Sequence, residues 1–171
     1  TFLCHTTSGG SDRVYAWFEE WLQTEWFDFE VYVSNLTEQY SQINVVGPNS
    51  RKLLERLTSS DVSNQNFKFM SCDQIDIGLM KTKIARLSVA GELGYEINCH
   101  ALELNALREL LLTEGRDLGV QEYGYYALNT LRLEKSFGIL LILSPCDIHT
   151  LIFCLLIPLN KSDFCLIFII V

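Results

Sequence analysis

A carboxylate within an alternating segment is the residue best placed to do chemistry in this chain. The segment Lys83 to Cys99 reads KIARLSVAGELGYEINC, with two alternating runs around a short connection that contains two glycines. This pattern predicts a β-hairpin with Glu96 on the face opposite Tyr95 and Ile97. A mid-strand carboxylate needs solvent or a partner, because burying it alone is costly. Glu96 therefore belongs either to a solvated strand face or to a site where it accepts two N–H bonds from a flat heterocycle.

Three ordered stretches resemble the aminomethyltransferase folate-binding family. Gly91 to Ile97, GELGYEI, is similar to the family's G-E-x-G-x-E-[IL] hairpin, and similar stretches precede and follow it at Leu36 to Arg51 and Tyr126 to Lys135. Together with WFEEWLQTEW at Trp17 to Trp26, they most resemble the C-terminal half of sarcosine oxidase alpha chains. The matching part of sarcosine and dimethylglycine dehydrogenases is also similar. The resemblance covers residues 1–138, which we expect to form a domain that is incomplete at both ends.

The resemblance implies a tetrahydrofolate-binding domain that captures a one-carbon unit from a small amine at N5–N10. FAD would be bound elsewhere in a flavoprotein, whose other domains or subunits would be the partners. Glu96 matches the pterin-binding glutamate, and Tyr95 and Arg86 are the other candidate folate-binding residues. The family's catalytic aspartate lies upstream of a TTSGG-like turn. We therefore expect it before Thr1 and assign no catalytic residue within the chain, since Asp12 lies after that turn.

Two differences from the family pattern indicate which branch of the family this chain resembles more. Glycine-cleavage members have Tyr-Thr where this chain has Val89-Ala90, and an arginine where it has Leu128. The chain is therefore nearer the amine-oxidising branch, with the amine (sarcosine, dimethylglycine or glycine) unspecified. The alternative is a non-catalytic regulatory homologue similar to the pyruvate dehydrogenase phosphatase regulatory subunit, although the retained Glu96 favours an enzyme. The implied compartment is the mitochondrial matrix if the protein is eukaryotic, with the cytoplasm as the alternative.

Composition argues against several other classes of function. The 171 residues carry a formal net charge of −8, and no basic run is longer than two residues, which argues against a nucleic-acid surface. The six cysteines form no CxxC pair, so their spacing predicts neither a metal site nor a disulfide framework. We expect them to be buried thiols of a reducing compartment.

The elements that must position Glu96 follow from apolar periodicity. Interspersed strands and helices without strict alternation predict an α+β domain, with mixed or antiparallel sheets and packed helices. Apolar helical spacing predicts buried faces through Trp17 and Trp21, and through Leu53, Leu54 and Leu57. Gly119 is expected to end a helix in the left-handed conformation. The remaining elements are predicted strands over residues 2–7, 30–36, 40–46 and 75–79 and predicted helices over 102–118 and 124–135.

The composition changes after Gly138. Residues 139–171 hold three charged residues and two prolines among apolar runs, and no period of 2 or 3.6 is sustained. The best membrane-helix candidate, Ile148 to Ile157, has ten residues, whereas a span needs about 18 or more. A membrane anchor is therefore the less favoured alternative. We predict that this tail builds no element and is not native to the domain.

Overall fold

The computed structural model describes residues 2–6, 8–135 and 165–170. The chain divides into two compact units, Thr1–Tyr40 and Ser41–Val171. Within the described residues, no helix combines the length and apolar character that crossing a bilayer requires.

The first unit contains one long helix, α1 (Ser11–Thr24), between two single turns, η1 (Ser8–Gly10) and η2 (Thr37–Gln39). Residues 2–6 and 30–36 form no strand, so the two strands predicted in this unit are absent. The helix is confirmed, but none of its residues is buried, and Trp17 is 56% exposed. Trp21 instead stacks on Trp26 at 5.2 Å between ring centroids, and Trp26 stacks on Phe29 at 6.1 Å. The expected core packing of Trp17 and Trp21 is therefore wrong.

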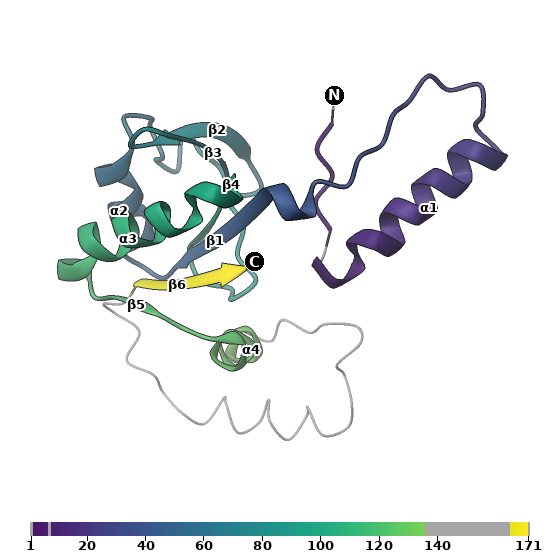
Figure 1. Ribbon diagram of the computed structural model, residues 1–171. Helices are drawn as coiled ribbons and strands as arrows, with labels where there is room; N and C mark the ends of the chain where they lie inside the picture. The colour runs from purple at the N-terminus through teal and green to yellow at the C-terminus, as the bar shows by residue number, and fades with distance from the viewer. Residues whose placement is uncertain (1, 7, 136–164, 171) are drawn as a thin grey trace. The chain divides into compact units, whose positions relative to one another are not determined.

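The second unit is a mixed sheet with helices, which confirms the α+β class (Figure 1). The six strands lie in the order β2-β3-β4-β1-β6-β5, with β5 parallel to β6 and the β2–β3, β3–β4 and β1–β6 pairs antiparallel. The strands are β1 (Tyr40–Val46), β2 (Cys72–Ile77), β3 (Met80–Ala85), β4 (Gly94–His100), β5 (Val120–Glu122) and β6 (Cys165–Ile170). The helices are α2 (Ser50–Leu57), α3 (Leu104–Glu114) and α4 (Tyr125–Glu134), with single turns η3 (Ala101–Glu103) and η4 (Arg116–Leu118).

One face of the sheet carries the main hydrophobic core. Alternate residues of β1 and β4 point into it, and α2 and α3 supply leucines from the other side. Its members include Ile43, Val45, Leu53, Leu54, Tyr95, Ile97, Leu107 and Leu111, all fully buried. The predicted apolar face of α2 is thus confirmed. The predicted 102–118 helix ends earlier, at Glu114, and Gly119 adopts the expected left-handed φ of 70° after η4.

The predicted hairpin exists, but its connection is longer than expected. Strands β3 and β4 pair in antiparallel register, with Ala85 opposite Glu96. The alternating residues after Ala85 are not a strand, so the connection runs over 86–93. Arg86 leaves the ladder because its backbone bonds elsewhere: its N–H donates to the Ser71 carbonyl (2.9 Å), and its carbonyl accepts from Met70 (3.1 Å). Alternation alone therefore overestimated the length of the first strand.

The opposite face of the sheet carries the polar residues of β1. Gln42, Asn44 and Val46 alternate with Ile43 and Val45, so they point away from the main core. Val46 packs in a small separate cluster with Ala90 and with Leu128 of α4. Figure 1 accordingly shows α4 apart from α2 and α3, beyond β5 and β6. Helix α4 therefore covers part of this second face.

The end of the chain contributes a strand that the sequence did not predict. Strand β6 pairs antiparallel with β1, with Asn44 opposite Phe168, and parallel with β5. Unpaired N–H and C=O groups at a strand edge accept another extended segment readily, so an apolar run without its own periodicity can still form a strand there. The expectation that residues 139–171 build no element is wrong for β6. The expectation for residues 139–164 lies outside the described part of the chain.

Candidate functional site

The three family-like stretches meet at the turn that precedes β4. The Leu93 carbonyl accepts from the Gly47 N–H at 2.8 Å and from Ser50 Oγ at 3.2 Å. Beside it, Glu92 forms an ion pair with Lys135 at the end of α4, at 2.9 Å. Segments far apart in the sequence therefore fix the turn from two sides. Strand β4, and with it Glu96, starts from an anchored point.

Two glycines of this turn are required by the backbone. Gly91 has a φ of 76°, a left-handed conformation that side chains with a Cβ rarely adopt. A Cβ on Gly94 would lie 2.9 Å from the Leu87 carbonyl oxygen and 3.0 Å from Ser88 Cβ. The backbone therefore requires glycine at both positions, whether or not a ligand binds.

Tyr95 lies in the main core, on the face opposite Glu96. Its side chain is fully buried, and its ring stacks nearly parallel on Phe67, with centroids 6.1 Å apart. The hydroxyl accepts from Arg51 Nε at 3.0 Å, while Arg51 Nη2 donates to Asn64 at 2.7 Å. The structure thus places Tyr95 where it joins α2 and the following loop to β4.

Arg86 reaches the same loop as Tyr95. Its Nη1 donates to the Phe67 carbonyl at 2.6 Å, so its guanidinium holds the segment whose ring stacks on Tyr95. Arg86 and Tyr95 therefore come together at Phe67, and neither joins Glu96 on the opposite face. Of the three predicted folate-binding residues, Glu96 alone lies on the second face of the sheet.

Glu96 is half-buried in a group of polar side chains on that second face. We call this group the polar face; it consists of Gln42, Asn44, Lys83, Glu96 and Asn98. Burial raises the pKa of the Glu96 carboxyl, and a hydrogen bond from the Gln42 side chain opposes the rise. Among the described residues, no ion pair includes Glu96.

The polar face is ordered by side-chain amides. Gln42 Nε2 donates to Asn44 Oδ1 at 2.7 Å, and Asn98 Nδ2 donates to the Lys83 carbonyl at 3.3 Å. Asn44 and Asn98 are both buried. Sequence reasoning missed these amides, although the polar residues at 42 and 44 in an otherwise apolar strand were a visible signal. A charged carboxylate beside fixed amides can accept paired N–H bonds from one edge of a flat heterocycle.

Ala90 and Leu128, two of the residues that depart from the glycine-cleavage pattern, belong to one buried cluster. Ala90 is 1% exposed and Leu128 is 7% exposed, and both contact Val46 beside the polar face. A guanidinium at position 128 would have to lose its hydration in this apolar cluster. Ala90 of the turn and Leu128 of α4 therefore join these two segments through one apolar cluster.

The first unit holds a separate hollow of its own. It is lined by Ser11, Asp12, Asn35, Thr37 and Glu38. Asn35 Nδ2 donates to Asp12 Oδ1 at 2.9 Å, and Asn35 Oδ1 accepts from the Thr37 N–H at 3.0 Å. The Asp12 carboxylate thus helps to hold the segment after α1.

The cysteines only partly follow the prediction. Cys99 is buried, whereas Cys4 and Cys72 are exposed free thiols, which corrects the expectation for those two. In the part of the chain that the structure describes, no group of three or more His, Cys, Asp and Glu side chains is arranged to hold a metal ion.

Comparison with known proteins identifies similar sequences over most of the chain. The GCVT N-terminal domain family model matches residues 1–141. Sarcosine oxidase subunit alpha from Corynebacterium sp. (strain U-96) is 42% identical over 139 residues, which cover 80% of this chain and 14% of that protein. Human mitochondrial dimethylglycine dehydrogenase is 34% identical over 150 residues, or 88% of this chain and 17% of that protein. An aminomethyltransferase from Geobacillus sp. (strain WCH70) is 35% identical over 117 residues, 68% of this chain and 32% of the relative. The chain thus spans less than a fifth of the length of the sarcosine oxidase and dimethylglycine dehydrogenase relatives.

Proposed function

Because this chain belongs to the GCVT N-terminal domain family, we propose that it is the tetrahydrofolate-binding, one-carbon-transfer part of a flavoprotein that oxidises sarcosine or dimethylglycine. The proposal rests mainly on the environment of the Glu96 carboxylate. Its carboxylate is half-buried on the polar face, has a raised pKa, and forms no ion pair among the described residues. Holding a carboxylate in this way destabilises a fold unless a ligand or partner uses it.

The chemistry of the polar face fits the pterin end of a reduced folate. A pterin presents adjacent ring and amino N–H groups along one edge, and the two oxygens of Glu96 would accept them as a charge-assisted pair. Gln42 would hold that carboxylate, while the buried amides of Asn44 and Asn98 keep the surrounding strands in place. When bound, the folate supplies the nitrogens that take up the one-carbon unit. Tyr95 and Arg86 would act indirectly, by fixing the core side of β4.

The amine-oxidising branch is supported by the packing beside this face. Ala90 and Leu128 replace polar residues of glycine-cleavage members together, and both contact Val46. In this proposal the amine site and FAD belong to other domains or subunits of the parent protein. The human relative is named as mitochondrial, and we extend that compartment to this protein if its source is eukaryotic, with the cytoplasm otherwise.

Calorimetric titration of the intact protein with a reduced folate tests the proposal. We expect Glu96→Gln to weaken binding by about 1–3 kcal/mol, because the amide replaces a charged acceptor with a neutral one. Glu55→Gln, on the exposed surface of α2, is the matched control and should leave the affinity unchanged. Equal affinities for wild type and Glu96→Gln would contradict the site. A wild-type protein that binds no reduced folate would instead favour the non-catalytic regulatory homologue.

A further inference from the structure

We propose that the polar face extends along β3 into a second subsite, where Lys83 and, beyond it, Lys81 bind the carboxylates at the far end of a bound folate. This inference rests on the proposed function of Glu96 and deepens it, because it concerns the other end of the same ligand. A folate joins its pterin to a glutamate through a benzoyl group, so its N–H donors and its carboxylates lie well apart. Strands β3 and β4 are neighbours in the sheet and carry groups that suit both ends.

The strand register places the two lysines on the face of Glu96. Ala85 is the partner of Glu96 on β4. Lys83 is the partner of Asn98, one row further along the same two strands. Because every second residue of a strand points to the same face, Lys81 and Lys83 share the face of Glu96. Two residues span about 7 Å of strand, so Lys83 lies about 7 Å and Lys81 about 14 Å along β3 from the row of Glu96.

The opposite direction along the sheet leads into an apolar cluster. The Gly47 N–H donates to the Leu93 carbonyl at 2.8 Å, so the end of β1 lies beside the start of β4. At this end Val46 packs in the buried cluster that includes Leu128 of α4. Carboxylates would lose their hydration among these side chains without gaining a partner. A folate whose pterin is held at Glu96 therefore extends the other way, along β3 and β4 toward the lysines.

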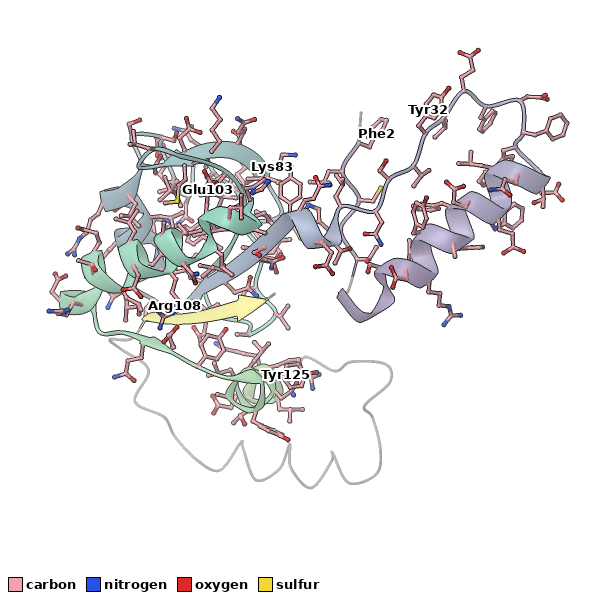
Figure 2. All side chains as sticks on the ribbon, viewed as in Figure 1. Phe2, Tyr32, Lys83, Glu103, Arg108 and Tyr125 are labelled. Carbon is pink, nitrogen blue, oxygen red and sulfur yellow. The ribbon has the colours of Figure 1, made fainter. Side chains whose placement is uncertain are left out.

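Lys83 is the lysine better placed to bind an anion. It is half-buried, and its partners on the neighbouring strands are the neutral Gln74 and Asn98 (Figure 2 labels Lys83). Lys81 is exposed and lies opposite Asp76, whose carboxylate offsets part of its charge. None of the ion pairs among the described residues includes either lysine. We therefore expect Lys83 to contribute more to anion binding than Lys81.

The test measures the affinity of the intact protein for 5-methyltetrahydrofolate and for its dimethyl ester, which has no free carboxylate. We expect Lys83→Met to weaken binding of the acid about five- to tenfold, because a half-buried charged donor is lost. The same variant should bind the ester as wild type does. Lys81→Met should weaken the acid about twofold. Lys83→Arg keeps the charge and should bind nearly as wild type, and Lys52→Met on the exposed surface of α2 is the matched control.

The outcomes separate this inference from the proposed function. Equal wild-type affinities for the acid and the ester would show that no group binds the carboxylates. A Lys83→Met protein that loses affinity for both ligands would make Lys83 a counter-ion of Glu96 instead. Equal losses in Lys83→Met and Lys52→Met would show an effect of net charge alone. Each of these results overturns the inference, and the pterin site stands if Glu96→Gln still weakens both ligands. A wild type that binds neither ligand overturns the proposed function and the inference with it. If Lys83→Met does not fold, Lys83→Gln takes its place in every comparison.

Discussion

At the scale of single residues, most residues of the Gly91 to Ile97 motif have structural roles, and Glu96 is the candidate for function. Gly91 and Gly94 are required by the turn, Glu92 is paired with Lys135, and Tyr95 is built into the core. Glu96 differs from these, because burial raises the pKa of its carboxyl and no ion pair among the described residues includes it. When a residue lowers the stability of a fold, a function is a good explanation for its presence.

This cost of Glu96 leads to a pH-dependent prediction. The pKa is raised above its ordinary value of 4.5 by burial, so the charged form destabilises the folded state at neutral pH. As the pH falls through the raised pKa, the carboxyl is protonated first in the folded state, and below 4.5 it is protonated in both states and the penalty has disappeared. We therefore expect Glu96→Gln to raise the melting temperature at pH 7, with the gain lost below about pH 4. Thermal unfolding across pH measures this, with Glu55→Gln as control. A melting temperature lowered at pH 7 would contradict the argument.

The turn before β4 provides a second residue-scale prediction. Gly94→Ala should destabilise the fold by about 1–3 kcal/mol, since its Cβ would contact the Leu87 carbonyl and Ser88 Cβ too closely. Urea unfolding is the measurement. Gly9→Ala has no atom within 4 Å of the added Cβ and should change stability by less than about 0.5 kcal/mol. Equal effects of the two substitutions would show that the close contact at Gly94 relaxes freely.

At the scale of elements, α4 and the turn before β4 act as one packed unit. The Glu92–Lys135 ion pair joins them at one point, and the contacts of Ala90 and Leu128 with Val46 join them at another. A partly exposed ion pair contributes little by itself, so the apolar cluster contributes more to this attachment than the ion pair does. The position of α4 therefore depends on residue 128 being apolar.

Leu128→Arg tests this dependence by introducing the residue type of glycine-cleavage members. We expect a loss of about 3–5 kcal/mol in unfolding free energy, because the guanidinium would lose its hydration among the apolar side chains of this cluster. The matched control is Leu102→Arg, since Leu102 is 88% exposed and the substitution should be nearly neutral. Chemical denaturation of both variants decides the point. A Leu128→Arg protein as stable as wild type would mean that α4 is attached by other contacts.

At the scale of the whole molecule, the described buried residues of the second unit's main core all precede α4. The main core draws its buried residues from β1 to β4, α2, α3 and the loop between α2 and β2, all within residues 41–118. The family match likewise ends at residue 141. Strand β6 adds a backbone neighbour to β1. We therefore still propose that the domain ends near Gly138 and that residues 139–171 are not native to it.

Truncation after Gly138 tests this proposal. The shortened chain should keep a single cooperative unfolding transition and the far-ultraviolet circular dichroism of the helices, because it retains every described buried residue of the main core. The β1–β6 and β5–β6 pairs are both lost with β6, so a decrease in strand signal is expected. Loss of cooperative unfolding would instead show that β6 is an integral strand. Transcript sequencing across the codon for Gly138 provides an independent check, since an unchanged spliced message would contradict the proposal.

Much of the second unit could be predicted from the sequence because local patterns agreed with tertiary packing. The apolar spacing of α2, the alternation in β1 and β4 and the left-handed Gly119 all follow from rules that act within a few residues. Where the pattern lacked a packing partner, as in α1, the helix formed but the burial of Trp17 did not. The strand expected over 30–36 failed in the same unit. Periodicity predicts which face is apolar, but it does not supply the surface that would cover it.

The sequence by itself determined that Glu96 is a mid-strand carboxylate on the side of β4 opposite Tyr95. Only the tertiary structure decided its surroundings, because those come from strands and helices that are distant along the chain. Gln42 lies 54 positions before Glu96, and its amide approaches because β1 and β4 are neighbours in the sheet. Arg86 was removed from the candidate face for a similar reason, since its hydrogen bond to Phe67 draws it to the core side. Strand alternation fixes the direction of a side chain, whereas sheet order and loop closure decide what it meets there.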